Sequence, residues 1–385
     1  MRLKQLKISA LIFIILLIVL PIATAFSKKE TKSDMENRTL ATFPKFSIQS
    51  VRDKSFMNGF ESYISDHFIG RIKWIELKVD TELLIGKKEI NNIYITDNML
   101  LEKLQEPNYP EINKSVDAIN NLAERFKNPE YYVLVAPTSA GIYLDKLPNN
   151  APQVQQKEAV IDYIYGSLSD NITSIDVYNN LYASKDEYIY YRNDHHWTSL
   201  GAYYAYNTAI QKLGFTPIPY SKFNIEHASD DFKGTFYSKS LYNGIKADTI
   251  DIYTMDKSKG IQSMVVNDGT SETTFDTLYD RSYLDTKDKY GTFLSENNPI
   301  VTVKTNIQND KKILIIKDSY ANSVVPFLAE HYSEITILDL RYIGITSENI
   351  VNINDYNQVL FLYNASTIAQ DENLKKMDYI FTTEQ

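Results

Sequence analysis

Residues 311–340 read KKILIIKDSYANSVVPFLAEHYSEITILDL, and this stretch decides the fold class. The continuous apolar run at residues 313–316 predicts a buried strand, and residues 321–331 predict a helix. Residues 335–340 form a second apolar, β-prone run. A strand, a helix and a strand in this order are typical of a parallel α/β unit. We therefore expect a parallel sheet with helices packed on it.

The same alternation continues on both sides of this stretch. Residues 131–136 are a continuous apolar run that predicts another buried strand, and residues 359–362 predict a last one. Residues 216–300 differ, because they are rich in Tyr, Asp, Ser and Thr and contain only short β-prone runs. We expect one α/β domain over residues 51–385, a three-layer α/β/α sandwich with a mainly parallel sheet and a partly β insertion at about 216–300.

Residues 1–26 carry a membrane signal. The run at residues 8–26 contains no charge and is about long enough to span a bilayer. Ala23-Thr24-Ala25 is similar to a cleavage site, so a removed signal peptide is the alternative. We expect a single-pass anchor at the cell membrane with the domain outside, or else a secreted protein, and a linker at residues 27–50. Three basic residues precede the run and set this orientation: Arg2, Lys4 and Lys7.

Composition narrows the possible chemistry. The chain has 385 residues, of which 43% are hydrophobic, so it can bury a large core. It contains no cysteine, which excludes disulfides, thiolate nucleophiles and cysteine-based zinc sites. Its formal net charge is -9. Because an acidic surface repels the phosphate backbone, no nucleic-acid partner is expected.

A serine follows the strand predicted at residues 313–316. The segment Lys317-Asp318-Ser319-Tyr320 lies where this strand ends and a helix begins, which brings a side chain to the carboxyl edge of a parallel sheet. Unpaired N–H groups at the helix start would stabilise an oxyanion. Ser319 is therefore a candidate nucleophile. The alternative is that Asp318 or Ser319 only caps the helix.

An aspartate and two histidines stand together in Asp194-His195-His196-Trp197. A serine nucleophile needs a base, and the base needs an orienting carboxylate. A turn could set the Asp194 carboxylate against the Nδ1–H of His196, with His195 pointing elsewhere. Two alternatives remain, a hydrogen bond within a turn and a metal site like that of the DHH phosphoesterases. Such metal sites need further aspartates from other strand ends, and none stands in a comparable context, so no metal and no cofactor are expected.

Weaker candidates for binding substrate or an oxyanion follow other predicted elements. Arg341 comes directly after the strand at residues 335–340 and could hold a substrate or structure the Ser319 loop. Asn364 follows the last strand at the same sheet edge and could donate a hydrogen bond to an oxyanion. Gly234 and Thr235 could supply a backbone N–H in the same role. Each of these residues is more often an ordinary turn or surface residue.

The motif Asp194-His195-His196-Trp197 resembles the signature of the DHHW family of exported bacterial proteins. The resemblance covers nearly everything after the first 26 residues. This family is similar in turn to the SGNH-hydrolase-like domain of alginate O-acetyltransferases, in which an Asp-x-His pair precedes the serine. Further segments carry the resemblance: Glu36-Asn37-Arg38 with Phe43-Pro44, Ser65-Asp66-His67-Phe68, and residues 315–323.

The resemblance implies an SGNH-like fold, with Ser319 as nucleophile, His196 as base and Asp194 as its orienting carboxylate. It also implies acyl transfer to or from a cell-surface or secreted polysaccharide, with a membrane-bound O-acyltransferase supplying the acyl group. An esterase with water as acceptor would use the same residues. A non-catalytic glycan-binding or assembly scaffold is a further alternative, favoured by Lys317, which stands where SGNH proteins usually have glycine.

Overall fold

The chain divides into two compact units in this computed structural model. The structure describes residues 2–152, 154–256, 259–344 and 350–381, and at residues 2–9 and 12 it describes only the backbone. The first unit comprises Met1–Asn91 with Tyr237–Gly244, and the second comprises Asn92–Phe236 with Ile245–Gln385. The α/β domain was expected to begin at residue 51, whereas this division begins it at Asn92.

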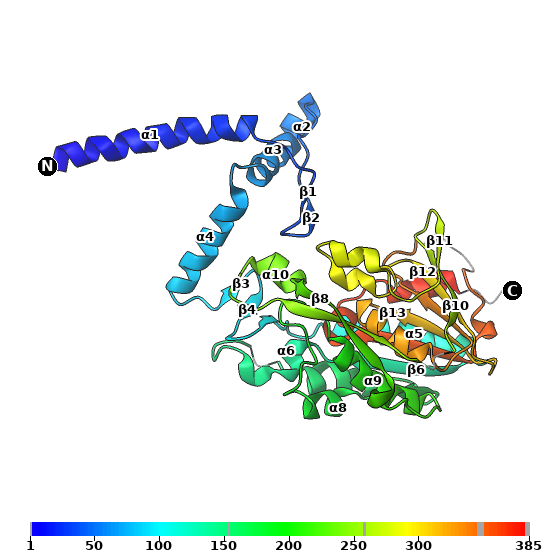
Figure 1. The fold of residues 1–385 in the computed structure, drawn as a ribbon. Coiled ribbons are helices and arrows are strands. Elements are labelled where there is room, and N and C mark those ends of the chain that lie inside the picture. The colour runs from blue at the N-terminus through cyan, green and yellow to red at the C-terminus, as the bar shows by residue number, and fades with distance from the viewer. Residues whose placement is uncertain (1, 153, 257–258, 345–349, 382–385) are drawn as a thin grey trace. The chain divides into compact units, whose positions relative to one another are not determined.

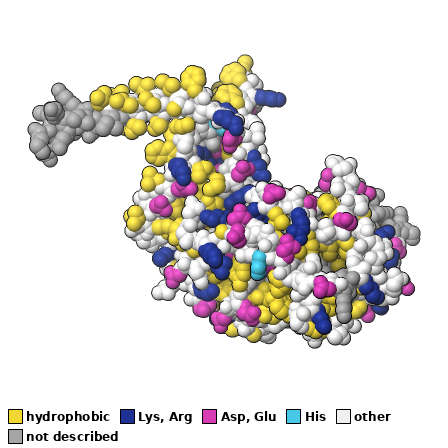
Figure 2. Space-filling view, in the orientation of Figure 1, with side chains coloured by type: hydrophobic (Ala, Val, Ile, Leu, Met, Phe, Trp, Pro, Cys, Tyr) yellow, Lys and Arg dark blue, Asp and Glu magenta, His cyan; other side chains and the backbone are white. Residues whose placement is uncertain are grey.

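The first unit consists mainly of helices. None of the helices among the described residues is both long and apolar enough to cross a membrane. Hydrophobic side chains are exposed along α1, for example Phe13 at 62% (Figure 2). The basic side chains of Arg2, Lys4 and Lys7 lie outside the described part, and the membrane location stays a prediction. The elements are α1 (Arg2–Phe26), β1 (Lys32–Ser33), β2 (Arg38–Thr39), α2 (Ile48–Arg52), α3 (Ser55–Asp66), α4 (Arg71–Leu84) and β3 (Glu89–Ile90).

An ion-pair network joins two of the family segments within this first unit. The guanidinium of Arg38 donates to both carboxylate oxygens of Asp66, with Nη1 3.0 Å from Oδ2. Asp66 also accepts the backbone N–H of Ala41 at 2.8 Å. The guanidinium of Arg71 pairs in the same two-pronged way with Glu36. These contacts hold the end of α3 and the start of α4 against the strand β2.

An eight-stranded sheet forms the centre of the second unit (Figure 1). The strands from β14 to β7 pair in parallel, while β12, β10 and β11 are added in antiparallel pairs at the β14 side. The predicted α/β class is therefore confirmed. In spatial order the strands are β11 (Glu272–Phe275), β10 (Ile261–Asn267), β12 (Ile300–Thr305), β14 (Glu334–Leu338), β13 (Lys312–Lys317), β15 (Gln358–Asn364), β6 (Glu130–Ala136) and β7 (Ile172–Ser174).

The central strands are buried on both faces, as their continuous apolar sequences predict. Successive side chains of a strand point to opposite faces, so β13 contributes Ile313 and Ile315 to one apolar core and Leu314 and Ile316 to the other. All four side chains are fully buried. The two cores on opposite faces of one sheet make the three-layer arrangement.

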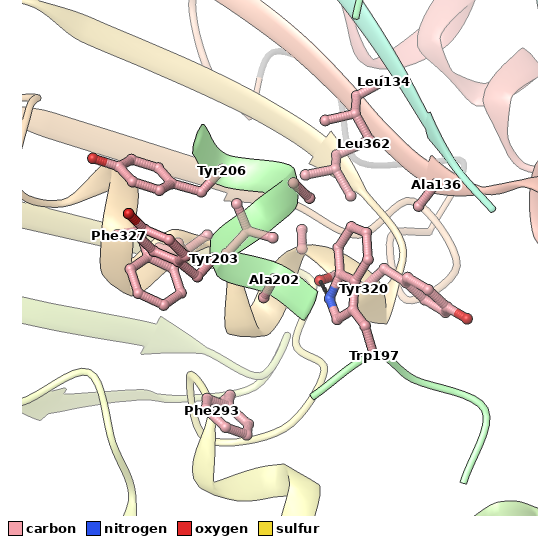
Figure 3. Packing of buried hydrophobic residues seen from close by; sticks show 14 of the residues in the cluster. Leu134, Ala136, Trp197, Ala202, Tyr203, Tyr206, Phe293, Tyr320, Phe327 and Leu362 are labelled. Atoms are coloured by element: carbon pink, nitrogen blue, oxygen red, sulfur yellow. Dashed lines mark hydrogen bonds between the residues drawn. The ribbon is translucent and has the colours of Figure 1, made fainter. Parts of the chain in front are cut away.

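Helix α9 covers one face of the sheet and α5 the other. Figure 3 shows Ala202 and Tyr203 of α9 in one core with Leu134 and Leu362 of the sheet. The remaining helices and strands belong to the second unit, except that residues 237–240 of α10 belong to the first. Most of them are short, and α5 and α9 are the longest. They are β4 (Ile93–Ile95), β5 (Leu100–Glu102), α5 (Tyr109–Arg125), α6 (Ser139–Ile142), the π-helix Lys157–Asp162, α7 (Tyr163–Gly166), α8 (Tyr178–Ala183), α9 (Ser199–Lys212), β8 (Asn224–Phe232), α10 (Thr235–Ser240), β9 (Asp248–Thr254), α11 (Val325–Leu328), α12 (Ala365–Ile368) and α13 (Met377–Ile380).

The helix predicted at residues 321–331 is shorter and interrupted. A 3-10 helix spans Ser319–Ser323, and α11 covers only Val325–Leu328. Pro326 explains the break, because it has no amide hydrogen to donate to the carbonyl four residues earlier. The prediction of a helical segment after β13 is therefore confirmed in place but not in length.

The insertion at residues 216–300 is partly β, as predicted. Strands β8 and β9 pair as an antiparallel hairpin, and β10 and β11 extend the main sheet. Two 3-10 helices follow, at Arg281–Asp285 and Lys289–Thr292. The insertion therefore does not lie outside the sheet but forms its antiparallel edge.

Candidate active site

The strand β13 delivers Ser319 to the carboxyl edge of the sheet. Asp318 caps the 3-10 helix that follows, because its Oδ1 accepts the N–H of Tyr320 at 2.9 Å. The other oxygen of Asp318 accepts the backbone N–H of Asn364 at the end of β15, at 2.7 Å. Burial raises the pKa of Asp318. The capping alternative is thus true of Asp318, and it leaves the hydroxyl of Ser319 available.

A bend in the backbone at residues 192–196 brings Asp194 and His196 together. Asp194 Oδ1 accepts the backbone N–H of His196 at 2.9 Å, which closes the turn. The turn is fixed on its far side by an isolated β-bridge between Tyr190 and Trp197. Immediately afterwards α9 begins, with Thr198 as its cap. Both ends of the turn are therefore attached to regular structure.

Ser319, His196 and Asp194 lie in one hydrogen-bonded chain, which we call the triad. Ser319 Oγ is 2.7 Å from His196 Nε2, and His196 Nδ1 is 2.6 Å from Asp194 Oδ1. Their exposed fractions are 6%, 5% and 2%. Because Asp194 accepts at Nδ1, the imidazole carries its proton there, and Nε2 is free to accept the serine proton. The arrangement has the order of groups that a serine nucleophile needs.

Burial and neighbouring charges set the protonation of the triad. Burial lowers the pKa of His196 to about 4, helped by the nearby charge of His195 and opposed by Asp194. Burial alone would raise the pKa of Asp194, but His195 and His196 hold it well below its ordinary value. At neutral pH His196 is therefore a neutral imidazole and Asp194 an ionised carboxylate. This is the state in which a base can take a proton.

The carboxylate of Asp194 is held from the other side by the insertion. Its Oδ2 accepts the backbone N–H of Thr235 at 2.7 Å. Gly234 makes this approach possible, since a Cβ at that position would lie only 2.1 Å from Asp194 Oδ2. The N–H of Thr235, which the sequence offered for an oxyanion, is therefore directed at Asp194 instead. Gly234 lies at the site as a neighbour of the carboxylate.

Asn364 does not supply the expected oxyanion donor. Its side-chain Nδ2 donates to Asp318 at 2.6 Å and to Thr367 at 2.7 Å, so both amide hydrogens are used. Its Oδ1 accepts the N–H of Thr367 and caps α12. The prediction for Asn364 is wrong for this reason. The residue connects the ends of β15 and β13 and fixes Asp318.

Arg341 and Lys317 share one buried carboxylate. Arg341 donates twice to Asp339, at 2.8 and 2.6 Å, and Lys317 Nζ lies 3.1 Å from the same group. Lys317 also donates to Asn297 at 2.8 Å. Burial lowers the pKa of Lys317, partly offset by Asp339. The lysine that replaces a glycine therefore extends towards Asp339, and its amine is not directed at Ser319.

The sequence suggested that His195 points away from the site, but in the structure its side chain lies at the site. Its Nδ1 lies 3.5 Å from Asp194 Oδ1, and its ring centre is 3.8 Å from that of His196. Consecutive side chains lie on the same side because the backbone bends here instead of being extended. The side chain is 31% exposed. Both histidines therefore act on one carboxylate.

Asp194, His195 and His196 offer ligand atoms that lie within 4.8 Å of one another, which raises the question of a metal. Two ligands of one tetrahedral zinc stand about 3.3 Å apart, given bonds of about 2.0–2.2 Å. Asp194 Oδ1 and His196 Nδ1 are closer than this, at 2.6 Å, and the other ring nitrogen of His196 is used by Ser319. The donor set fits a hydrogen-bonded triad better than a metal.

Two aromatic residues of the site were missed by sequence reasoning. Tyr290 stacks on the imidazole of His196, and its hydroxyl donates to the backbone carbonyl of Ser319 at 2.9 Å. The indole N–H of Trp197 donates to the carbonyl of Tyr320 at 3.0 Å, and the two rings pack together (Figure 3). Trp197 belonged to the quoted motif. Tyr290 stands in the insertion without any local signal.

Comparison with known proteins identifies the family of this chain. The profile described as DHHW protein matches residues 108–338, which is more than half of the chain and includes both Asp194 and Ser319. The chain belongs to the DHHW family. The resemblance predicted from the sequence is thereby confirmed.

Solved structures share the fold of this chain. A DHHW family protein from Eubacterium siraeum DSM 15702 is 24% identical, with a TM-score of 0.66 over 77% of this chain and 98% of that chain. PatB1 of Bacillus cereus is 25% identical, with a TM-score of 0.62 over 72% and 97%. A second PatB1 structure, with a sulfonyl adduct, is 23% identical, with a TM-score of 0.63 over 75% and 98%. No curated protein matches this DHHW chain in sequence.

Proposed function

We propose that this DHHW protein transfers or hydrolyses O-acyl groups of a cell-surface or secreted polysaccharide, with Ser319 as nucleophile. One observation carries the proposal. Ser319 Oγ and His196 Nε2 are 2.7 Å apart, although 123 residues separate them in the chain. A serine, a neutral imidazole and an ionised carboxylate in this order are the working parts of acyl transfer.

The reaction would run in two steps. Ser319 Oγ attacks the carbonyl carbon of an ester while His196 Nε2 takes the hydroxyl proton. The tetrahedral intermediate collapses, the bond to the leaving alcohol breaks, and His196 returns the proton to that oxygen. The acyl group is then on Ser319. A sugar hydroxyl, or water in an esterase, gives its proton to His196 and attacks the acyl carbon. The bond from the acyl carbon to Ser319 Oγ then breaks, and His196 returns the proton to Oγ, which restores the free serine.

Asp194 and a backbone N–H would stabilise the charges that develop. Asp194 keeps the Nδ1 proton in place and balances the imidazolium that forms. The N–H of Ser319 makes no hydrogen bond within the part of the chain that the structure describes, and it lies beside the reacting hydroxyl. It is the donor available for the oxyanion now that Asn364 is assigned to Asp318.

The chemistry of a neighbour supports a reactive nucleophile in this fold. PatB1 has been solved with a sulfonyl adduct, and sulfonyl groups bond to nucleophilic side chains. The acyl and polysaccharide parts of the proposal come from the family resemblance. So do the location outside the membrane and a membrane-bound O-acyltransferase as acyl supplier.

A non-catalytic glycan-binding scaffold remains the second candidate, because Lys317 replaces the glycine that usually precedes Asp-Ser. The position of Lys317 weakens that argument, since its amine is bound to Asp339 and Asn297.

The test is turnover of a small activated acetyl ester by wild type, Ser319→Ala and His196→Ala. We expect both variants to lose at least about 10³-fold in kcat, as is usual for members of such a unit. Ser333→Ala is the matched control, because its hydroxyl binds the Lys311 carbonyl at the opposite end of β13. Mass spectrometry should find the acyl group on Ser319. Equal turnover by wild type and Ser319→Ala would end the proposal.

Offering a soluble oligosaccharide as acceptor separates the two activities. An acylated sugar as product indicates a transferase, and free acid alone indicates an esterase. A wild type with neither turnover nor labelling by a sulfonyl fluoride supports the scaffold.

A further inference from the structure

The insertion at residues 216–300 contacts the triad at three places. Thr235 donates its N–H to Asp194. Tyr290 lies against His196 and also contacts the backbone of Ser319. None of these contacts is needed to form the central parallel strands, which are complete without the insertion. The insertion therefore has a structural connection to the reacting groups themselves.

The ring of Tyr290 covers one face of the imidazole of His196. The two ring centres are 3.7 Å apart and the planes differ by only 7°. Tyr290 is 4% exposed and is itself packed between Tyr191 and Phe293. A ring held in this way prevents the imidazole from turning away from Ser319 and keeps water off its face.

The hydroxyl of Tyr290 holds the turn that carries the nucleophile. It donates to the carbonyl of Ser319 at 2.9 Å and lies 3.2 Å from Ser323 Oγ. The indole of Trp197 binds the same turn, at the carbonyl of Tyr320 and at Ser323 Oγ. Because burial raises the pKa of Tyr290, its hydroxyl stays protonated and remains a donor.

The segment after Tyr290 holds a strained backbone. Leu294, Ser295 and Glu296 all have a positive φ, between 57° and 72°, although none is glycine. Such conformations cost free energy and persist only where surrounding contacts enforce them. The carbonyl of Glu296 accepts from the side chain of Asn322, at 3.4 Å, on the nucleophile turn. The strained segment is therefore attached to the same turn as Tyr290.

We propose that the insertion is a working part of this site, in which Tyr290 positions His196 and Ser319 for reaction. The inference rests on the function proposed above, and it assigns to Tyr290 a role that acts through other residues. One aromatic side chain fixes both partners of the proton transfer, the imidazole by its ring and the serine turn by its hydroxyl. A small misplacement of either partner costs about 10²-fold in rate.

Two variants separate the ring from the hydroxyl. Tyr290→Phe keeps the stacked ring, so the pKa of His196 should stay at its wild-type value while kcat falls about tenfold through the loosened turn. Tyr290→Leu removes the ring, so kcat should fall about 10²-fold with KM nearly unchanged. Water would then reach His196 and raise its pKa from about 4 towards 6.5. Tyr131→Phe is the matched control, since its buried hydroxyl also donates to a carbonyl, that of Phe126, away from the triad.

The measurements are kcat and KM on the activated ester and an NMR titration of the His196 imidazole, with thermal melting to confirm folding. Asp194, His195 and Arg341, whose charges act on His196, are present in every variant, so a changed titration reports on Tyr290. If Tyr290→Leu titrates and turns over like Tyr131→Phe, the inference is overturned. A wild type without turnover would refute the proposed function alone, and the titration would still decide the role of Tyr290. If Tyr290→Leu fails to fold, Tyr290→Phe still decides the question through kcat.

Discussion

The turn at residues 317–323, which carries Ser319, and the insertion at residues 216–300 supply the site in different ways. The turn continues directly from β13, and Asp318 fixes it to β15 at 2.7 Å. The insertion reaches the site through irregular structure, a 3-10 helix at Lys289–Thr292 and a run of positive φ angles after it. One region places Ser319 just after the end of a sheet strand, and the other packs around the groups already placed.

This difference separates two kinds of contribution to a site. Residues on a strand end are positioned by the backbone hydrogen bonds of the whole sheet, so their place is insensitive to any one side chain. Residues that support a site from an insertion depend on individual contacts, such as the approach of Gly234 to Asp194. Changes in the insertion should therefore reduce activity without removing any group that reacts.

The largest effect of this kind is expected for Gly234→Ala. Its Cβ would overlap Asp194 Oδ2 at 2.1 Å, so the carboxylate or the backbone must move. Because His196 is oriented by this carboxylate, kcat on the activated ester should fall about 10²-fold. Steady-state kinetics on the folded variant measures this.

The matched control for this change is Gly166→Ala, where an added Cβ meets no atom within 4 Å. It should retain wild-type activity. Equal activity of Gly234→Ala and Gly166→Ala would show that the insertion does not hold Asp194.

The pH dependence of turnover tests both regions together, because both of them help to bury His196, and this burial lowers its pKa. With the pKa of His196 lowered to about 4, the base stays neutral, and kcat/KM should be level from about pH 5 to 8. Below about pH 4 it should fall roughly tenfold per unit. A fall centred near pH 6.5 would show that His196 is open to water.

The free energy of unfolding should also depend on pH through the protonation of His196. The folded state binds fewer protons at His196 than the unfolded state between pH 4 and 6.5. The free energy of unfolding therefore decreases as pH falls through this window, and the decrease ends below about pH 4. Denaturant unfolding at several pH values, compared with His196→Gln, isolates this contribution.

The smallest effect on activity is expected for Lys317→Met, on the strand side of the comparison. The change removes a buried cation but leaves Asp339 paired with Arg341. Unfolding free energy should drop by about 1–3 kcal/mol, as for a buried polar contact, with kcat nearly unchanged. Urea unfolding with kinetics on the same sample tests this, and a large loss of kcat would mean that Lys317 acts on the Ser319 turn.

Strands were predicted correctly where a short, continuous apolar run indicated a buried strand. Ile313–Ile316 and Val359–Leu362 could only be buried strands, and both lie at the centre of the sheet. The helix after Ser319 was predicted too long, because Pro326 interrupts it. Asn364 was assigned to an oxyanion from its place at a strand end, yet its amide binds Asp318 and Thr367. Position along the chain predicts which edge a side chain reaches, whereas its hydrogen-bond partners depend on the neighbouring strands.

The sequence by itself determined the α/β class, the family and the identity of Asp194, His196 and Ser319 as candidates. The class follows from the apolar runs, the candidates follow from side-chain chemistry, and the family follows from the resemblance of its motifs; all three are local. Only the tertiary structure decided that the three side chains meet, since His196 and Ser319 are 123 positions apart in the chain. It also decided that Gly234 and Tyr290 support them. A contact between a glycine and a carboxylate, or between a tyrosine and an imidazole, depends on packing between distant segments, and no local pattern encodes it.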